Sequence, residues 1–468
     1  MGLWEWLTRN SHTSPRGAVS DGAPSADPSE GFAVIDVETT GLSPARHRIV
    51  EIAVVQTDVR GNPLKEWSTR INPQGPVGAT HIHGITAADV KNSPEFAAVI
   101  PHLISQLQGR VLVAHNASFD VAFLAQEFAR ASWLWPETPS LCTMREASYF
   151  LPQLHRRRLI DCCEVSGIRI AHAHSALGDA RATSVLLRSY LDERFGPPPL
   201  AQHLQLPKAA HQTVWPLEPM PPGTVAPHAK PAAQRASQHF HRSAAHAKAP
   251  VKVAVSLLSQ VGIREVLGSG VPDYTVGYIE ALLSALEDGA LSEEEIQALE
   301  DLANGMRLDE GDVHAVRLGV AHALAAAAVE DGTISKAERS ELKQVLVLLG
   351  FEEKEAAGFL NDARRNRCER LSTGLPPLPE QWKMGEPLHV GDNVVFTGCD
   401  PQWRTHFEAE AHRRGVQVAS GVSKKTAMLV SDGSYSGTKA DKAAALGTRV
   451  VQPRHFEMLL QHIQPYVD

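Results

Sequence analysis

Residues 32–42 read FAVIDVETTGL and place two carboxylates, Asp36 and Glu38, in an otherwise apolar strand pattern. Side chains alternate between the two faces of a strand, so these carboxylates point the same way, roughly 6.5–7 Å apart. Two like charges on one face of a buried strand repel each other and lose hydration, which is costly without a compensating partner. Protons, basic side chains or metal ions could compensate, and the rest of the chain must indicate which.

The totals set the broad class of the protein. With 468 residues the chain is too long for one hydrophobic core, so two to four domains are expected. Its 43% hydrophobic and 21% charged residues are typical of soluble proteins. The net charge of −8 does not by itself suggest a nucleic-acid partner, because negative charge opposes phosphate, but the charge is unevenly distributed.

The cysteines and the apolar runs indicate the cellular compartment in which the protein is expected. The five cysteines are odd in number and form no CxxC pair, which argues for a reducing compartment without a zinc site or a disulfide framework. No apolar run approaches transmembrane length, and the N-terminal residues lack the pattern of a signal peptide. We therefore expect a cytoplasmic protein without a membrane partner.

Changes in composition divide the chain into five stretches. Residues 1–30 are rich in Ser, Pro, Gly and Asp and are expected to be disordered. Strand and helix patterns alternate over 31–196, which predicts an α/β domain. Residues 197–250, rich in Pro, Ala and His, predict a flexible linker. Residues 251–370 have an acidic, all-helical pattern, and residues 387–468 predict a small α/β domain.

Two further acidic motifs follow the first within 31–196. In LVAHNASFDVAFL, Asp120 lies just past a predicted strand, at the start of an amphipathic helix. In HAHSALGDARATSVLL, His174 precedes a helix and Asp179 follows five residues later. The order Asp-x-Glu, Asp, His-x(4)-Asp resembles the DEDDh (DnaQ-like) 3′–5′ exonucleases, the family of the DNA polymerase III epsilon subunit. The segment HIHGITAADV (81–90) resembles that family as well.

This resemblance implies an RNase H-like fold with a mixed sheet and a metal-dependent nuclease site. Asp36, Glu38, Asp120 and Asp179 would be the metal ligands, since carboxylate oxygens suit Mg²⁺ or Mn²⁺. Two such ions about 3.5–4 Å apart can stabilise the attacking and leaving oxygens of a phosphoryl displacement. His174 would be the general base that takes a proton from the attacking water. Bound metal would then offset the repulsion between the first two carboxylates.

The same resemblance implies substrate contacts beside the acidic motifs. The turn after Glu38 would hold the terminal nucleotide, with the leucine against a base; its residues are Thr39, Thr40, Gly41 and Leu42. For His115 and Asn116, a substrate contact and a structural hydrogen bond are equal alternatives. The run HRRRL (155–159) adds Arg156, Arg157 and Arg158, which either form a solvated helix face or attract phosphate.

The acidic helical stretch contains an internal repeat, in which ALEDGALSEEEIQALEDL (285–302) matches AVEDGTISKAERSELKQV (328–345). The spacing resembles half of a calcium EF-hand loop, but most positions that need oxygen ligands in the other half are apolar. Helix capping is the simpler interpretation. Gly289 and Gly332 would each end a helix, and two capping boxes would begin the next: Ser292 with Glu295 and Ser335 with Glu338. The pair of junctions resembles the TerB-like helical domain, for which metal binding is the alternative.

The C-terminal stretch resembles a BRCT domain of the subtype in NAD-dependent DNA ligases and the clamp-loader large subunit. The resemblance rests on NVVFTGCD (393–400), GVQVASGVSKKTAMLVSDG (415–433) and GTKADKAAALGTRVV (437–451). Phe456 stands where BRCT domains often have Trp. The subtype implies a pocket for a DNA 5′-phosphate or a phosphoprotein, formed by Thr397, the Gly398 N–H and Lys439. A protein-docking fold without phosphate is an equal alternative.

The sequence as a whole predicts a 3′–5′ exonuclease tethered to an acidic helical domain and a BRCT domain. DNA is preferred as substrate because of the BRCT neighbour, and a role in repair or end processing with a polymerase or repair partner follows. One alternative is a 3′–5′ exoribonuclease. The other is a DNA-end-binding scaffold with an inactive nuclease domain, which the complete acidic set argues against.

Overall fold

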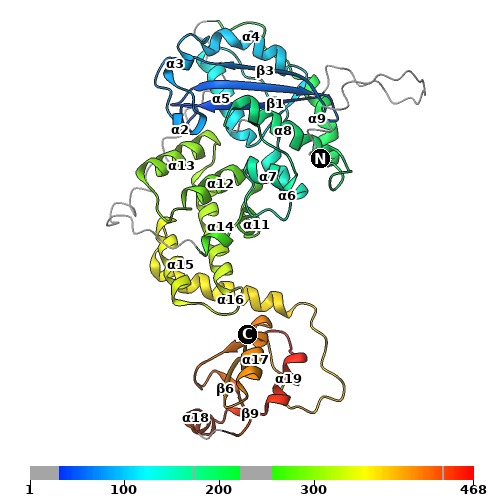
Figure 1. Ribbon diagram of the computed structural model, residues 1–468, viewed down its shortest axis with the longest axis vertical. Coiled ribbons are helices and arrows are strands. Elements are labelled where there is room, and N and C mark those ends of the chain that lie inside the picture. The colour runs from blue at the N-terminus through cyan, green and yellow to red at the C-terminus, as the bar shows by residue number, and fades with distance from the viewer. Residues whose placement is uncertain (1–30, 172–173, 222–255, 435–436, 468) are drawn as a thin grey trace, which may run out of the picture. The chain divides into compact units, whose positions relative to one another are not determined.

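The computed structural model describes residues 31–171, 174–221, 256–434 and 437–467 (Figure 1). The chain forms two compact units. The first comprises Met1–Pro250 with Gly262–Gly319, and the second comprises Val251–Val261 with Val320–Asp468. The predicted disordered stretch 1–30 lies outside the described residues.

A mixed five-stranded sheet forms the centre of the first unit, with the strand order β3-β2-β1-β4-β5. Its strands are β1 (Gly31–Thr39), β2 (Ile49–Thr57), β3 (Pro63–Arg70), β4 (Arg110–Ala114) and β5 (Ser140–Cys142). β1 pairs antiparallel with β2 and parallel with β4, so it is a central strand. The mixed sheet expected for this part of the chain is confirmed.

Helices cover both faces of this sheet. Ala33 and Ile35 of β1 pack on the face covered by α4 (Phe96–Leu107) and α5 (Ala117–Arg130). Phe32 and Val34 pack on the opposite face, against α8 (Ala176–Leu191). Since side chains alternate along a strand, Asp36 and Glu38 continue the α8 face beyond its apolar part. The connections contain α2 (Thr80–His83), α3 (Ala87–Val90), α6 (Thr143–Phe150) and α7 (Leu159–Val165).

The linker predicted from residue 197 begins too early. Residues 201–211 form α9 (Ala201–His211), and Ala210 packs in the core on the α8 face. Trp215 is 5% exposed, and its ring meets the rings of Trp135 and Phe128 edge to face. Burial of so large an apolar ring stabilises a packed arrangement that the Pro-rich composition disfavours. The rest of the predicted linker, from 222 on, lies outside the described residues.

The predicted helical domain 251–370 is divided between the two units, with the boundary inside α14 (Glu310–Val329). The first unit receives α11 (Ile263–Leu267), η3 (Asp273–Thr275), α12 (Val276–Ala285) and α13 (Glu293–Gly305). The first predicted junction is confirmed, because Gly289 has φ 78° and Ser292 forms a capping box with Glu295. Among the described helices, only α14 is long and apolar enough to cross a membrane, and half of it is buried, as in a core helix.

The second unit begins with η2 (Leu258–Gln260) and continues through α15 (Lys336–Leu348), η4 (Glu353–Glu355) and α16 (Ala356–Ser372). The second junction is confirmed, with φ 86° at Gly332 and a capping box between Ser335 and Glu338. Both junctions therefore have the structural role that capping predicts.

The C-terminal part of the second unit is a parallel four-stranded sheet in the order β7-β6-β8-β9. The strands are β6 (Asn393–Thr397), β7 (Gln417–Val418), β8 (Thr426–Ser431) and β9 (Arg449–Val451), and the helices are α17 (Pro401–Arg413), α18 (Thr438–Leu446) and α19 (Pro453–Gln461). Phe456 is fully buried, with its ring centroid 5.2 Å from that of Phe396. The predicted small α/β fold is confirmed; its BRCT assignment stays a prediction.

Candidate active site

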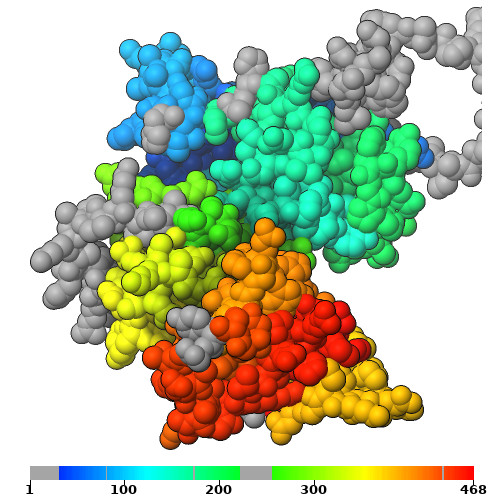
Figure 2. All heavy atoms as spheres, turned by 60° about the horizontal axis from the view of Figure 1, so that its bottom comes forward, coloured from blue at the N-terminus to red at the C-terminus, as the bar shows by residue number. Residues whose placement is uncertain are grey.

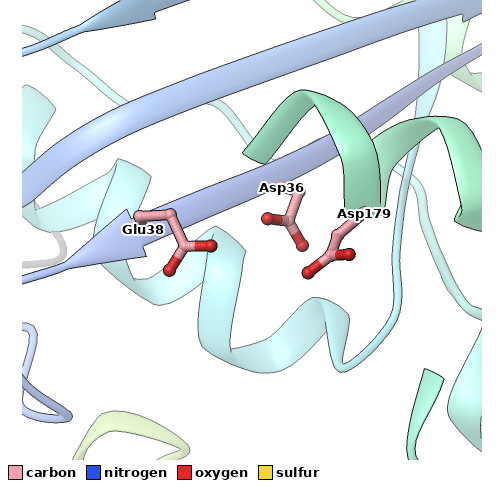
Figure 3. A group of neighbouring side chains, drawn as sticks. All are labelled: Asp36, Glu38 and Asp179. Carbon is pink, nitrogen blue, oxygen red and sulfur yellow. The ribbon is translucent and has the colours of Figure 1, made fainter. Parts of the chain in front are cut away.

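Three carboxylates from two elements converge on the α8 face of the sheet. Asp36 and Glu38 extend from β1, and Asp179 extends from the first turn of α8, all toward one shared space (Figure 3). One oxygen atom of each lies within 4.8 Å of the others. Ligand atoms about 2.0–2.6 Å from one shared cation have separations of this order. The arrangement therefore fits a divalent metal ion.

Asp120 stands beside this group rather than within it. It lies in the first turn of α5 and is 4% exposed. Loss of hydration raises the pKa of Asp36 well above its usual range, and the charge of Asp120 raises it further. The four carboxylates were predicted to converge; the structure clusters three and places the fourth close enough to act on them electrostatically.

Burial raises the pKa of the four predicted metal ligands, Asp36, Glu38, Asp120 and Asp179. Loss of hydration raises the pKa of Glu38 to about 7, with added repulsion from Asp179 and Glu51. It raises the pKa of Asp120 to about 8, although the Val37 backbone N–H acts in the opposite direction. The metal-free site therefore holds protons near neutral pH that a divalent cation would displace. This donor set fits Mg²⁺ or Mn²⁺ better than softer metals.

We expect the metal-free protein to lose stability as the pH rises from about 5 to about 8.5. The folded-state pKa values of Glu38 and Asp120 are raised, so the folded site binds more protons than the unfolded chain does. The stability present at low pH is thus lost as the pH rises through about 7 to 8. Saturating Mn²⁺ should restore it, because the metal replaces the protons.

Scanning calorimetry with and without Mn²⁺ checks this expectation. Without metal, Tm should fall by about 3–6 °C over that pH range. Glu38→Gln is the matched control, because an amide of the same shape cannot ionise and should reduce the dependence on pH. A wild-type Tm that rises over this range without metal would contradict the expectation.

His174 lies just before α8 and has a left-handed backbone, with φ 63°. A non-glycine residue in this region stores strain of about 1–3 kcal/mol, which surrounding contacts must offset. Its backbone N–H donates to the Asp179 carboxylate at 3.3 Å, and its side chain is exposed. Loss of hydration raises the pKa of Asp179, while the N–H and the ring of His174 lower it. The predicted base therefore lies next to the carboxylate cluster.

Glu51 is a residue of this site that the sequence analysis missed. It pairs with Glu38 across β1 and β2, and its Oε2 accepts a hydrogen bond from the Ala176 N–H at 2.8 Å. That N–H belongs to the first turn of α8, so Glu51 caps the helix that carries Asp179. The available signal was an acidic residue inside the apolar strand IVEIAVV, the same signal that marked Asp36.

Glu51→Ala is expected to lower kcat about 10- to 100-fold, because α8 is left with only its Ser175 cap and holds Asp179 and His174 less firmly. Glu51→Gln keeps an oxygen acceptor and should retain most of the activity. Steady-state kinetics of the two variants decide between positioning and charge. Equal losses in both variants would mean that the charge of Glu51 matters, rather than the helix cap.

The turn predicted to hold the terminal nucleotide is fixed by its own hydrogen bonds. The Thr39 hydroxyl donates to the Gly41 carbonyl at 2.8 Å. The Thr40 N–H donates to the Arg48 carbonyl at 2.9 Å, and the Thr40 hydroxyl accepts from the Arg48 N–H at 3.1 Å. Leu42 is left 37% exposed, so an apolar side chain is open to solvent next to the site. The substrate contacts themselves stay predictions.

His115 and Asn116 differ in their surroundings. The His115 ring contacts the Thr143 hydroxyl at 2.9 Å and the Arg157 carbonyl at 2.7 Å through its two nitrogens. Loss of hydration lowers its pKa to about 4. These contacts favour the structural alternative for His115. Asn116 is partly exposed at the start of α5, with φ 99°, and its substrate role stays a prediction.

The three arginines of the basic run all pair within the first unit. Arg156 donates to Glu280 of α12, Arg157 is 2% exposed and donates to Ser148, and Arg158 pairs with Asp161. All three are engaged by protein groups rather than left as unpaired phosphate binders, and Arg158 alone of the three is exposed to solvent. Of these contacts, the one between Arg156 and Glu280 joins residues far apart in sequence, so no local pattern could indicate it.

The predicted phosphate residues of the C-terminal domain lie together near a carboxylate. Thr397 ends β6, and the ammonium group of Lys439 donates to the Phe396 carbonyl at 3.0 Å. Gly398 has φ 64°, and a Cβ there would lie 2.5 Å from an Asp432 oxygen. Asp432 also accepts from the Cys399 N–H at 3.0 Å. A bound phosphate would meet this negative charge, which the sequence analysis did not consider.

The comparisons with known proteins concern the first domain. Residues 33–187 match the RNase T exonuclease family. The PolC-type DNA polymerase III of Oceanobacillus iheyensis is 36% identical over 178 residues, which is 37% of this chain and 12% of that protein. A Mycobacterium tuberculosis protein described as a bifunctional exonuclease/endonuclease is 36% identical over 184 residues, 35% of this chain and 27% of that protein. The chain thus spans a small part of the length of these relatives.

Solved structures show only a weak likeness. E. coli Exonuclease I in complex with a dT13 oligonucleotide has a TM-score of 0.31 and 22% identity, over 35% of this chain and 41% of that one. A likeness of this size adds nothing to the family match. Asp36, Glu38 and Asp179 of the acidic cluster all lie within the residues that match the family. Residues 33–187 therefore match the RNase T exonuclease family and carry the acidic cluster.

Proposed function

We propose that this chain hydrolyses phosphodiester bonds stepwise from the 3′ ends of nucleic acid, with DNA as the preferred polymer. The observation that carries the proposal is the cluster of Asp36, Glu38 and Asp179 within a domain that matches an exonuclease family. When bound there, two ions of Mg²⁺ or Mn²⁺ would activate a water and stabilise the charge that develops on the leaving oxygen.

The protein's own groups would perform the remaining tasks. The clustered carboxylates and Asp120 would hold the metal ions in place of the protons that they retain because burial raises their pKa values. An imidazole nitrogen of His174 would take the proton of the attacking water. The exposed Leu42 side chain would pack against the terminal base.

DNA rather than RNA, a repair or end-processing role, and a polymerase or repair partner belong to this proposal through the BRCT resemblance. Of the two alternatives for this domain, the position of Asp432 favours docking of a protein without phosphate. The other is a DNA 5′-phosphate or a phosphoprotein bound near Thr397 and Lys439. The TerB-like identity of the helical part and the cytoplasmic location are proposed on the sequence grounds given above.

A cleavage assay tests the proposal. Single-stranded DNA and RNA of one sequence, labelled at the 5′ end, are incubated with Mg²⁺, Mn²⁺ or a chelator. We expect a ladder that shortens from the 3′ end only with metal, and a faster reaction with DNA. Faster cleavage of RNA would make the chain an exoribonuclease. Tight binding of DNA ends without cleavage in either metal would favour the inactive end-binding scaffold instead.

A further inference from the structure

Helices α11–α13, residues 263–305, pack on the loops that flank the exonuclease site, and we call them the cover segment. Figure 2 shows its green and light-green atoms against the blue and teal atoms of the exonuclease domain. Both belong to the first unit. Contacts occur at three places, and each involves a loop next to one of the predicted substrate or metal residues.

The first contact is with the loop that follows the nucleotide-binding turn. Asp301 of α13 is buried and forms an ion pair with Arg46. Gly305, at the end of the same helix, lies against Pro44, since a Cβ on this glycine would be 2.9 Å from the proline Cδ. Pro44 and Arg46 follow Leu42 within four residues. The end of α13 therefore adjoins the turn that would hold the terminal nucleotide.

The second contact is with the start of α5. Gly277 of α12 is buried, and a Cβ there would lie 2.4 Å from the Asn116 side-chain oxygen. Only a residue without a side chain allows so close an approach. Asn116 immediately precedes α5, and Asp120 is in the first turn of that helix. The cover segment thus covers the side of the site from which Asp120 enters.

The third contact surrounds Arg156. Its Nε donates to the Glu280 carboxylate at 2.6 Å, one terminal nitrogen donates to Glu287 at 2.6 Å, and the other donates to Ser284 at 2.7 Å. Glu280 is 6% exposed and also accepts from the Arg157 N–H at 3.1 Å. A buried carboxylate with these partners is costly to separate from them, so the segment is firmly seated.

These contacts place negative charge where a nucleic-acid strand needs positive charge. Arg46 lies four residues after Leu42, and Arg156 precedes Arg157, whose carbonyl contacts His115. Both Arg46 and Arg156 are paired with acids of the cover segment. Exposed acids on the same segment, Glu287, Glu293 and Glu294, would repel further phosphates. A terminal nucleotide meets little of this surface, whereas a long strand must displace the acids from the two arginines.

We infer that the cover segment determines the length of strand that the exonuclease site accepts. While the segment is in place, the site cleaves short substrates more efficiently than long strands. Glu280 and Asp301 are the residues that set this preference. The inference rests on the proposed exonuclease function, so its test must separate the two.

Two substrates separate the chemical step from strand binding. The p-nitrophenyl ester of thymidine 5′-monophosphate reports the chemical step alone, and a long single strand of DNA requires the surface next to the site. Glu280→Gln with Asp301→Asn removes two charges at the arginines. Glu293→Gln with Glu294→Gln removes two charges from the exposed surface of the same segment and is the matched control.

The first double variant should raise kcat/KM on the long strand about tenfold and leave ester hydrolysis unchanged. Its salt dependence should steepen by about 0.7 in log kcat/KM per log salt, because Arg46 then reaches a phosphate of a single strand while Arg156 keeps its ion pair with Glu287. The control should change far less. Gly277→Leu tests the same inference without a charge change, because the new side chain collides with Asn116 and must displace the segment.

The possible outcomes distinguish a failure of this inference from a failure of the proposed function. An increase on the long strand alone, in either the double variant or Gly277→Leu, supports the inference. If the folded variants do no better than the control while the ester is hydrolysed, the inference is wrong and the proposed function stands. If the wild-type protein hydrolyses neither substrate with Mg²⁺ or Mn²⁺, the proposed function is wrong and the inference falls with it.

Discussion

Asp36→Asn is expected to lower kcat on single-stranded DNA by at least about 10³-fold, the largest effect of any single substitution in this chain. The carboxylate of Asp36 is adjacent to all the others, since Asp120, Asp179 and Glu38 each raise its pKa after the larger effect of burial. The amide keeps the shape of the side chain but supplies neither the charge nor the second oxygen that divalent cations need. Titration calorimetry should show the loss of Mn²⁺ binding in parallel with the loss of activity.

The same substitution should stabilise the metal-free protein. A neutral amide ends the repulsion among the buried carboxylates, so Tm at about pH 8 without metal should rise above that of the wild type. Asp192→Asn is the matched control, because Asp192 pairs with Arg194 on the surface, outside the site. It should leave both activity and Mn²⁺ binding unchanged. A wild-type rate in Asp36→Asn would show that these carboxylates do not carry the reaction.

The sheet and the acidic residues could be predicted because their signals are local. In β1 the alternation of side chains assigns Phe32 and Val34 to one face, and this fixes the direction of Asp36 and Glu38. The capping boxes of the acidic repeat were predictable for the same reason, since Ser292 and Glu295 satisfy each other within one helical turn.

The features that the sequence could not indicate depend on residues far apart in the chain. Nothing near Glu280 shows that its partner is Arg156, because acidic residues on a helix are usually solvated. The Pro-rich surroundings of Trp215 gave no sign that its ring fills the core beside Trp135. Glu51 carried the right signal, an acid in an apolar strand, but its partner is a backbone N–H in α8.

His174→Gly is the second decisive substitution, and the backbone makes glycine the right choice. His174 has φ 63°, a conformation that glycine adopts without strain, so the substitution should not lower Tm. Loss of the general base should nevertheless lower kcat about 10²- to 10⁴-fold, while Mn²⁺ binding to the carboxylates is retained. A parallel fall in Mn²⁺ binding would instead assign His174 to the metal site.

Addition of imidazole distinguishes a lost base from a displaced helix. The His174 side chain is exposed, so imidazole from solution can reach the space that glycine leaves and accept the proton of the attacking water. We expect partial recovery of kcat in His174→Gly and none in Asp36→Asn, whose defect lies in metal binding. His174→Asn, which tolerates the same backbone conformation, fills that space and should recover less. If His174→Gly keeps kcat within about threefold of the wild type, another group takes the proton, because a general base contributes at least about 10²-fold.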